Sequence, residues 1–170
     1  MSRFGYVMVT YFVVLIMGIF SFFHHRPRVM WNTTASAPLG LYALHIPKEL
    51  KVGDLVADLP PPALARFMAE RHYLPLNVPL LKYVGAITGQ NVCRQGATVT
   101  IDGLTVATAL ATDHANRPLP VWQGCRILKD GEIFLLNPSV TDSFDGRYYG
   151  AVPLDGVTAV ATPLWTESAE

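Results

Sequence analysis

Two residues of this sequence, Ser36 and Lys82, have types and surroundings suited to a nucleophile and its base. Ser36 stands between Ala35 and Ala37, directly before Pro38, in a stretch that follows an apolar segment. A serine hydroxyl is a weak nucleophile at neutral pH, so it needs a nearby base and donors for the developing oxyanion. A lysine can be that base when burial removes water from its amine, because desolvation disfavours the charged ammonium. The pattern therefore indicates acyl transfer by a Ser/Lys dyad.

Lys82 is the lysine most enclosed by apolar sequence. Leu80 and Leu81 precede it, and Tyr83 and Val84 follow it. No histidine of the chain is an obvious alternative base. A strand lysine that faces solvent remains the competing interpretation, because lysine is seldom fully buried.

The composition argues against two classes of partner. Lys plus Arg and Asp plus Glu each number 13, which gives a formal net charge of zero. The chain also lacks a basic run interleaved with aromatic residues, so we expect no nucleic-acid partner. No Cys-x-x-Cys motif and no Cys/His cluster at zinc spacing occurs, so we expect neither a metal nor a cofactor.

An apolar segment from Phe4 to Phe23 carries no charge. About 20 such residues match the hydrocarbon thickness of a bilayer. A cleaved signal peptide is the alternative, although its apolar region is usually shorter and its cleavage site lies closer behind. We expect residues 1–24 to be an uncleaved anchor and residues 25–170 to be the catalytic domain. Basic residues lie on both sides of the segment, so their charges do not decide the topology.

The two cysteines, Cys93 and Cys125, are either free thiols or a single disulfide. A disulfide needs an oxidising compartment. A membrane-anchored domain that faces outward would provide one, so we favour the disulfide.

Short apolar or alternating runs separated by turn residues predict a mostly β domain with barrel-like closure. The predicted strand regions cover residues 41–46, 51–59, 80–87, 98–106, 132–137 and 157–161. One helix is expected over Ala63–His72, where Leu64, Phe67 and Met68 recur at helical spacing. We expect this insert to rest on the membrane or to line the substrate entrance.

Three blocks, in this order behind the apolar segment, resemble the type I signal peptidase superfamily and in particular its conjugative transfer peptidases. Asn32–Tyr42 is similar to the nucleophile pattern N-x-T-x-S-x-P-x-G-x-Y. Leu81–Gln90 resembles the block that contains the catalytic lysine, and Ser143–Gly150 resembles the pattern S-x-D-S-R-Y-x-G. The resemblance implies a signal-peptidase-like β-barrel-type domain with a short helical insert and one transmembrane helix.

The resemblance also implies roles for individual residues. Ser36 would be the nucleophile, and Lys82 would take its proton and later protonate the leaving amine. The Ser36 backbone N–H and the Thr34 hydroxyl would stabilise the oxyanion, and Ser143 would orient the Lys82 amine. For Thr34 and Ser143 an ordinary structural hydroxyl is the alternative.

Asp145 and Arg147 would form an ion pair that supports the loop of the third block. The aspartate is linked to activity in the conjugative branch, so we include it among the catalytic candidates beside a purely structural interpretation. Ala37 and Gly146 replace the Met and Ser common in signal peptidases, and Asn137 begins a segment that lacks their Gly-Asp-Asn-Arg run. These departures favour the conjugative branch.

The expected function is that of a membrane-anchored serine endopeptidase that cleaves an exported precursor after small residues. The resemblance points to the conjugative propilin as substrate, with inner-membrane lipid and other conjugative transfer proteins as further partners. The expected location is the bacterial inner membrane, with a single span and the catalytic domain in the periplasm. Water or an amine can resolve the acyl-enzyme, so a linear and a cyclic product both stay open.

Three alternatives remain beside this function. The chain could be a general type I signal peptidase, or a non-enzymatic envelope assembly factor of a type IV secretion system in which Ser36 and Lys82 lie far apart. A self-cleaving repressor relative is the third. The apolar segment and the lack of an Ala-Gly dipeptide argue against it.

Overall fold

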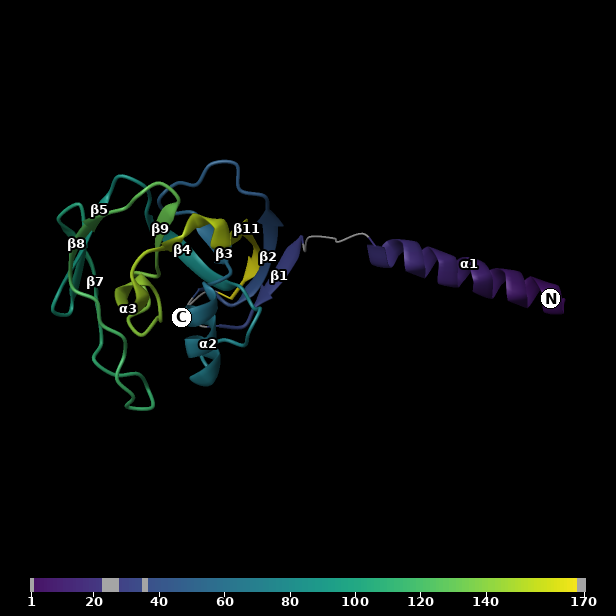
Figure 1. Cartoon of the computed structure of the whole chain (residues 1–170), viewed down its shortest axis with the longest axis horizontal. Coiled ribbons are helices and arrows are strands. Elements are labelled where there is room, and N and C mark those ends of the chain that lie inside the picture. The colour runs from purple at the N-terminus through teal and green to yellow at the C-terminus, as the bar shows by residue number, and fades with distance from the viewer. Residues whose placement is uncertain (1, 23–27, 35–36, 168–170) are drawn as a thin grey trace.

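The computed structural model describes residues 2–22, 28–34 and 37–167 (Figure 1). Ser36 and the expected domain boundary after residue 24 lie outside these residues. Helix α1, Arg3–Phe22, spans 20 residues. Its stretch from Arg3 to Ser21 has a mean hydropathy of 2.0, so the helix is long and apolar enough to cross a membrane.

Two antiparallel sheets form the framework of the remaining chain, which confirms the mostly β fold class. The larger sheet has seven strands in the order β1-β2-β11-β3-β4-β9-β10, and the smaller has the order β7-β6-β5-β8. The larger sheet comprises β1 Val29–Asn32, β2 Gly40–His45, β3 Leu55–Asp58, β4 Leu80–Ala86, β9 Glu132–Leu136, β10 Val152–Pro153 and β11 Val157–Thr166. The smaller comprises β5 Asn91–Gln95, β6 Thr98–Ile101, β7 Leu104–Thr108 and β8 Gly124–Ile127.

The larger sheet curls (Figure 1). Its two edge strands are β1 and β10. Strand β11 pairs with both β2 and β3 and so joins the two halves of the sheet. It continues past the predicted end at residue 161 because Pro163 sits where the ladder to β2 shifts register. Proline is tolerated at such irregularities, where its missing N–H does not interrupt a regular ladder.

Two α-helices lie within the β domain. Helix α2, Pro62–Glu70, begins with proline in its first turn, where a missing N–H costs nothing. It ends ahead of His72, whose positive φ of 59° is incompatible with a continued helix. Helix α3, Gly146–Tyr149, was not predicted and is capped by the Asp145 side chain. A 3-10 turn, η1, covers Leu154–Gly156.

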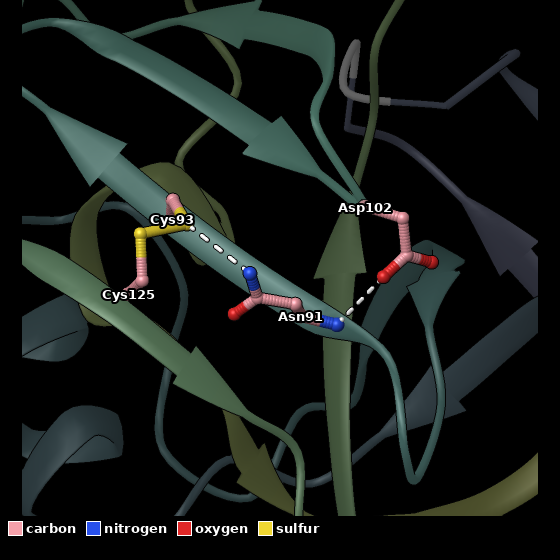
Figure 2. Close-up of a disulfide and its surroundings, with 4 residues drawn as sticks. All are labelled: Asn91, Cys93, Asp102 and Cys125. Carbon is pink, nitrogen blue, oxygen red and sulfur yellow. Dashed lines mark hydrogen bonds between the residues drawn. A yellow bond between two sulfur atoms is a disulfide. The ribbon is translucent and has the colours of Figure 1, made fainter.

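The smaller sheet carries the disulfide between Cys93 and Cys125 (Figure 2). The two residues lie directly opposite each other on β5 and β8, with their Cα atoms 4.0 Å apart. The bond therefore fastens an edge strand within this sheet. It closes a loop with a sequence separation of 32, which stabilises the fold by about 3–4 kcal/mol in the chain-entropy account.

One apolar cluster attaches the smaller sheet to the larger one. It combines Val92 and Val99 of the smaller sheet with Ala86 of β4 and Phe134 of β9. All four residues are almost completely buried. Strand β4 is therefore packed against the smaller sheet near its end and hydrogen-bonded to β3 and β9 along its edges, which makes it a rigid support for Lys82.

Candidate active site

Lys82 lies at the middle of β4, opposite Val56 of β3. Its side chain is buried, with 2% of the residue exposed, and its Nζ donates a hydrogen bond of 2.7 Å to Ser143 Oγ. Burial lowers the pKa of Lys82 to about 8, although the carboxylate of Asp145 opposes this shift. The amine is therefore partly neutral near physiological pH. Lys82 and Ser143 are the pair that the sequence analysis selected, and their catalytic roles stay predictions.

The loop that carries Ser143 is wound around the guanidinium of Arg147. Arg147 donates to the backbone carbonyls of Asn137, Val140 and Thr141. It also donates from Nε and Nη2 to Asp145, at 2.9 and 2.8 Å. The Asp145 carboxylate accepts the backbone N–H of Asn137 as well, and both ionic side chains are fully buried. This network fixes the backbone that precedes and follows Ser143.

Position 146 requires glycine because the same loop packs closely against β9. A Cβ atom at this position would lie 2.7 Å from the Leu135 carbonyl oxygen and 2.7 Å from the Phe134 ring. A serine, which carries a Cβ atom, would not fit here without a shift of β9.

Asn32, at the end of β1, organises the chain on both sides of residues 35–36. Its Nδ2 donates to the carbonyl oxygens of Thr34, Ala37 and Pro38 at 3.0, 3.1 and 3.0 Å. Its Oδ1 accepts from the Thr34 backbone N–H. Tyr42 adds a hydrogen bond of 2.7 Å from its hydroxyl to the Pro38 carbonyl. The role of Asn32 was not predicted from the sequence, although this residue is the first of the nucleophile pattern N-x-T-x-S-x-P-x-G-x-Y.

Thr34 uses its hydroxyl inside this turn. Its Oγ1 donates to Asn32 Oδ1 at 2.8 Å. A hydroxyl has one proton to donate, so Thr34 would have to rotate away from Asn32 to serve an oxyanion. Its expected role stays a prediction, as does that of Ser36, which lies outside the described residues.

A cleft of about 1090 Å³ brings these parts together. Lys82 and Ser143 line it, as do Asn32 and Thr34 from the opposite strand region. Most of the remaining lining is apolar and comes from β1, the segment around α2, and the loops 110–119 and 140–148. The cleft is large enough for several residues of an extended peptide. Within the described residues, no three His, Cys, Asp or Glu side chains form a metal-binding group.

Comparison with known proteins now identifies the family. The sequence matches the family described as signal peptidase, peptidase S26, over residues 1–165. The chain belongs to the S26 signal peptidase family.

Relatives within this group carry names from plasmid transfer. A probable conjugal transfer protein TraF of Sinorhizobium fredii is 37% identical over 145 residues, which cover 79% of this chain and 76% of that protein. The conjugal transfer protein TraF of Agrobacterium fabrum is 33% identical over 147 residues, covering 79% of this chain and 81% of that protein. A signal peptidase I of Enterococcus faecalis is similar in structure over 69% of this chain and 100% of that chain, with 18% identity and a TM-score of 0.41.

Membership in the S26 family agrees with the resemblance derived from the three sequence blocks. It supports a serine peptidase of the signal peptidase type, and the two relatives are named as conjugal transfer proteins. Asn32 and Gly146 are the residues whose structural roles became visible only in three dimensions.

Proposed function

We propose that this protein is a membrane-anchored serine endopeptidase in which Ser36 is the nucleophile and Lys82 the general base. One observation carries the proposal. A buried lysine with a pKa of about 8 lines the same cleft as Asn32, Thr33 and Thr34, and Ser36 follows Thr34 two positions later in the sequence. Structural lysines are usually exposed and charged, so the burial of this amine in a cleft favours a chemical role.

The proposed reaction begins when the neutral Lys82 amine accepts the Ser36 hydroxyl proton. The Ser36 oxygen attacks the scissile carbonyl carbon, and the C–N bond then breaks while Lys82 returns the proton to the leaving amine. An ester between Ser36 and the substrate results. Water or a substrate amine then attacks this ester and loses a proton to Lys82. Lys82 passes this proton to the departing Ser36 oxygen, which restores both the Ser36 hydroxyl and the neutral amine. Ser143 holds the Lys82 amine in place through the hydrogen bond of 2.7 Å.

The proposed substrate is an exported precursor, the conjugative pilin subunit. The names of the relatives in Sinorhizobium and Agrobacterium support a task in conjugal transfer. The cleft, whose lining is mostly apolar, supports an extended peptide with small or apolar side chains as ligand. Attack by water gives a linear pilin, whereas attack by the substrate's own amine gives a cyclic one.

The proposed location is the inner membrane, with α1 as its single span and the β domain in the periplasm. Two features support it. Helix α1 is predominantly apolar after Arg3 and is long enough to cross a membrane. The disulfide between Cys93 and Cys125 forms and persists in oxidising compartments rather than in the cytosol.

The test is pilin maturation by the full chain carrying Ser36→Ala or Lys82→Ala. Co-expression with the cognate pilin precursor, followed by mass spectrometry of the product, should show at least about a thousandfold loss of processing for either variant. The exposed Ser139→Ala and Lys129→Ala variants are matched controls and should process normally.

Normal maturation by either active-site variant would contradict the dyad and favour a non-enzymatic assembly factor. An unrelated exported precursor in the same assay separates a conjugative peptidase from a general signal peptidase. We expect that precursor to remain uncleaved. The mass of the mature pilin also distinguishes the products, because ring closure leaves the chain one water lighter than hydrolysis.

A further inference from the structure

Ser143, the residue that contacts Lys82, is followed directly by an aromatic residue in a dense cluster. Phe144 lies close to four other aromatic rings, at centroid distances of 5.0 to 5.6 Å. These rings belong to Phe67, Tyr73, Tyr148 and Tyr149. The two closest to parallel are Tyr148, at 3°, and Phe67, at 20°. Phe144 is therefore held between α3 and the helical insert α2.

The partners of Phe144 are themselves fixed by polar contacts. The Arg71 guanidinium lies 4.4 Å from the centre of the Phe67 ring, a favourable cation–π distance. The Tyr73 hydroxyl donates to Asp113 at 2.5 Å, and Asp113 also accepts from Arg117 Nε at 2.7 Å. The insert and the loop around residue 113 thus form one connected wall around Phe144.

A hydrogen bond also connects α3 to the loop 109–119. The Tyr148 hydroxyl accepts the backbone N–H of Leu110 at 3.0 Å, and Tyr148 is 2% exposed. The cluster therefore joins three segments that are far apart in sequence: α2, the loop 109–119 and the block 143–149.

The Asp145–Arg147 network fixes the backbone on both sides of Ser143 through hydrogen bonds to Asn137, Val140 and Thr141. Phe144 supplies the complementary restraint, because its side chain is clamped by residues outside that loop. If this clamp were loosened, the Ser143 hydroxyl could move away from Lys82 and water could enter beside the amine. Water around the amine would remove the desolvation that disfavours its charged form.

We propose that Phe144 is a positioning residue for the reaction and that the α2 insert acts through it. The aromatic cluster holds Phe144, Phe144 fixes Ser143, and Ser143 keeps the Lys82 amine in place and shielded from water. This proposal rests on the proposed function only in its predicted effect on kcat. The effect on the Lys82 amine is independent of whether the protein is a peptidase. The insert that we expected to meet the membrane or the substrate is thereby assigned an internal task as well.

The test follows Lys82 directly by NMR. The chain has four lysines, at positions 48, 51, 82 and 129, so labelling with ε-13C-lysine gives four signals. A Lys82→Met variant of the full chain in detergent micelles identifies the signal of interest. Charged groups near Lys82, namely Asp142, Asp145 and Arg147, are left unchanged in every variant.

We expect the Lys82 pKa to rise by about one unit in Phe144→Leu, which lowers the neutral fraction at pH 7 about tenfold. The same tenfold loss should appear in kcat, with little change in KM. Phe144→Tyr keeps the ring and should restore both values. Phe67→Leu removes a ring of the cluster from α2 and should produce the same rise in the Lys82 pKa. This variant replaces Phe144→Leu in the test if Phe144→Leu folds poorly.

Leu128→Ala is the control for a general loss of packing. Leu128 is 1% exposed and belongs to the core beneath the smaller sheet, away from the aromatic cluster. The Leu128→Ala variant should lower Tm without changing the pKa of Lys82. A Lys82 pKa that stays unchanged or falls in folded Phe144→Leu and Phe67→Leu would overturn the positioning role. A pKa that rises while kcat stays constant would instead refute Lys82 as the base and leave the positioning role intact.

Discussion

The pKa of Lys82 sets the proton balance of the proposed reaction. Removal of water from the amine lowers the pKa of Lys82, Asp145 and Asp142 oppose this shift, and Arg147 adds to it. The resulting pKa is about 8. Asp142 itself accepts a hydrogen bond from His114 at 2.7 Å at the edge of the cleft. At pH 7 about one tenth of the Lys82 amines are neutral, which is enough for a general base that is regenerated in each cycle.

The rate should therefore rise with pH. A base acts in its neutral form, and a lysine becomes neutral as the pH passes its pKa, so kcat/KM should fall about tenfold per unit below pH 8 and level off above it. The measurement uses the full chain in micelles and a precursor-derived peptide without titratable side chains. A rate that is flat from about pH 6 to 9 would mean that another group supplies the base.

At the scale of elements, the end of β1 is as important as β4. Asn32 belongs to β1, is 5% exposed, and connects the strand to the carbonyls of the following turn. Only glycine fits at position 40, at the start of β2. A Cβ there would lie 2.2 Å from the Trp165 carbonyl oxygen, and the φ of 148° disfavours other residues. The described residues on either side of residues 35–36 are thus held by the ends of two strands.

Replacing Asn32 by Asp should test this element. The Oδ1 acceptor for Thr34 is retained, but the Nδ2 donor becomes an oxygen facing the carbonyls of Ala37 and Pro38. We expect kcat to fall about 10- to 100-fold from misplacement of the nucleophile, with a loss of about 1–3 kcal/mol in the free energy of unfolding.

The exposed Asn77→Asp is the matched control for that substitution and should leave both quantities unchanged. Steady-state kinetics and urea unfolding supply the two readings. Full activity in Asn32→Asp would show that the turn does not depend on the asparagine amide.

The hydrophobic pattern of the sequence predicted the strands in which apolar and polar residues alternate or in which a continuous apolar run is buried, such as β2, β4 and β9. It missed β8, whose four residues are all exposed, so no alternation marks it, and the strand is held by its ladder and by the Cys93–Cys125 bond. It also missed α3, which is too short for helical periodicity and begins at the Asp145 cap.

The candidate site divides in the same way. Lys82 and Ser143 could be selected because residue type and the order of three blocks carried the signal. Asn32 and Phe144 could not, since the importance of Asn32 depends on a turn geometry and that of Phe144 on rings from distant segments. Contacts of that kind leave no periodic trace in a single sequence.

At the scale of the whole molecule, the outer face beside β1 is unusually apolar. Val29 and Trp31 of β1 and Leu164 and Trp165 of β11 are each more than half exposed, and the two tryptophan rings stack at 5.7 Å. Six residues separate α1 from β1, which allows a reach of at most about 25 Å. Tryptophan favours the membrane–water interface. We therefore expect this face to rest on the bilayer to which α1 anchors the chain.

Tryptophan fluorescence can measure this contact in the full chain. The sequence has three tryptophans, and the third, Trp122, is partly buried and donates to the Gly146 carbonyl. In vesicles of brominated phosphatidylcholine, the lipid should quench most of the emission of Trp31 and Trp165. In the double variant Trp31→Ser, Trp165→Ser the remaining Trp122 emission should be insensitive to bromine.

The double variant Leu164→Ser, Trp165→Ser leaves Trp31, which lines the cleft, in place. It should process a membrane-inserted precursor several-fold more slowly while cleaving a soluble peptide normally, because only the membrane-bound substrate requires the domain to lie at the bilayer surface. Leu104→Ser with Ile127→Ser removes two similarly exposed apolar side chains from the smaller sheet and should change neither rate. Unquenched emission from the unsubstituted chain, or equal losses in both double variants, would show that the tryptophan face has no special relation to the lipid.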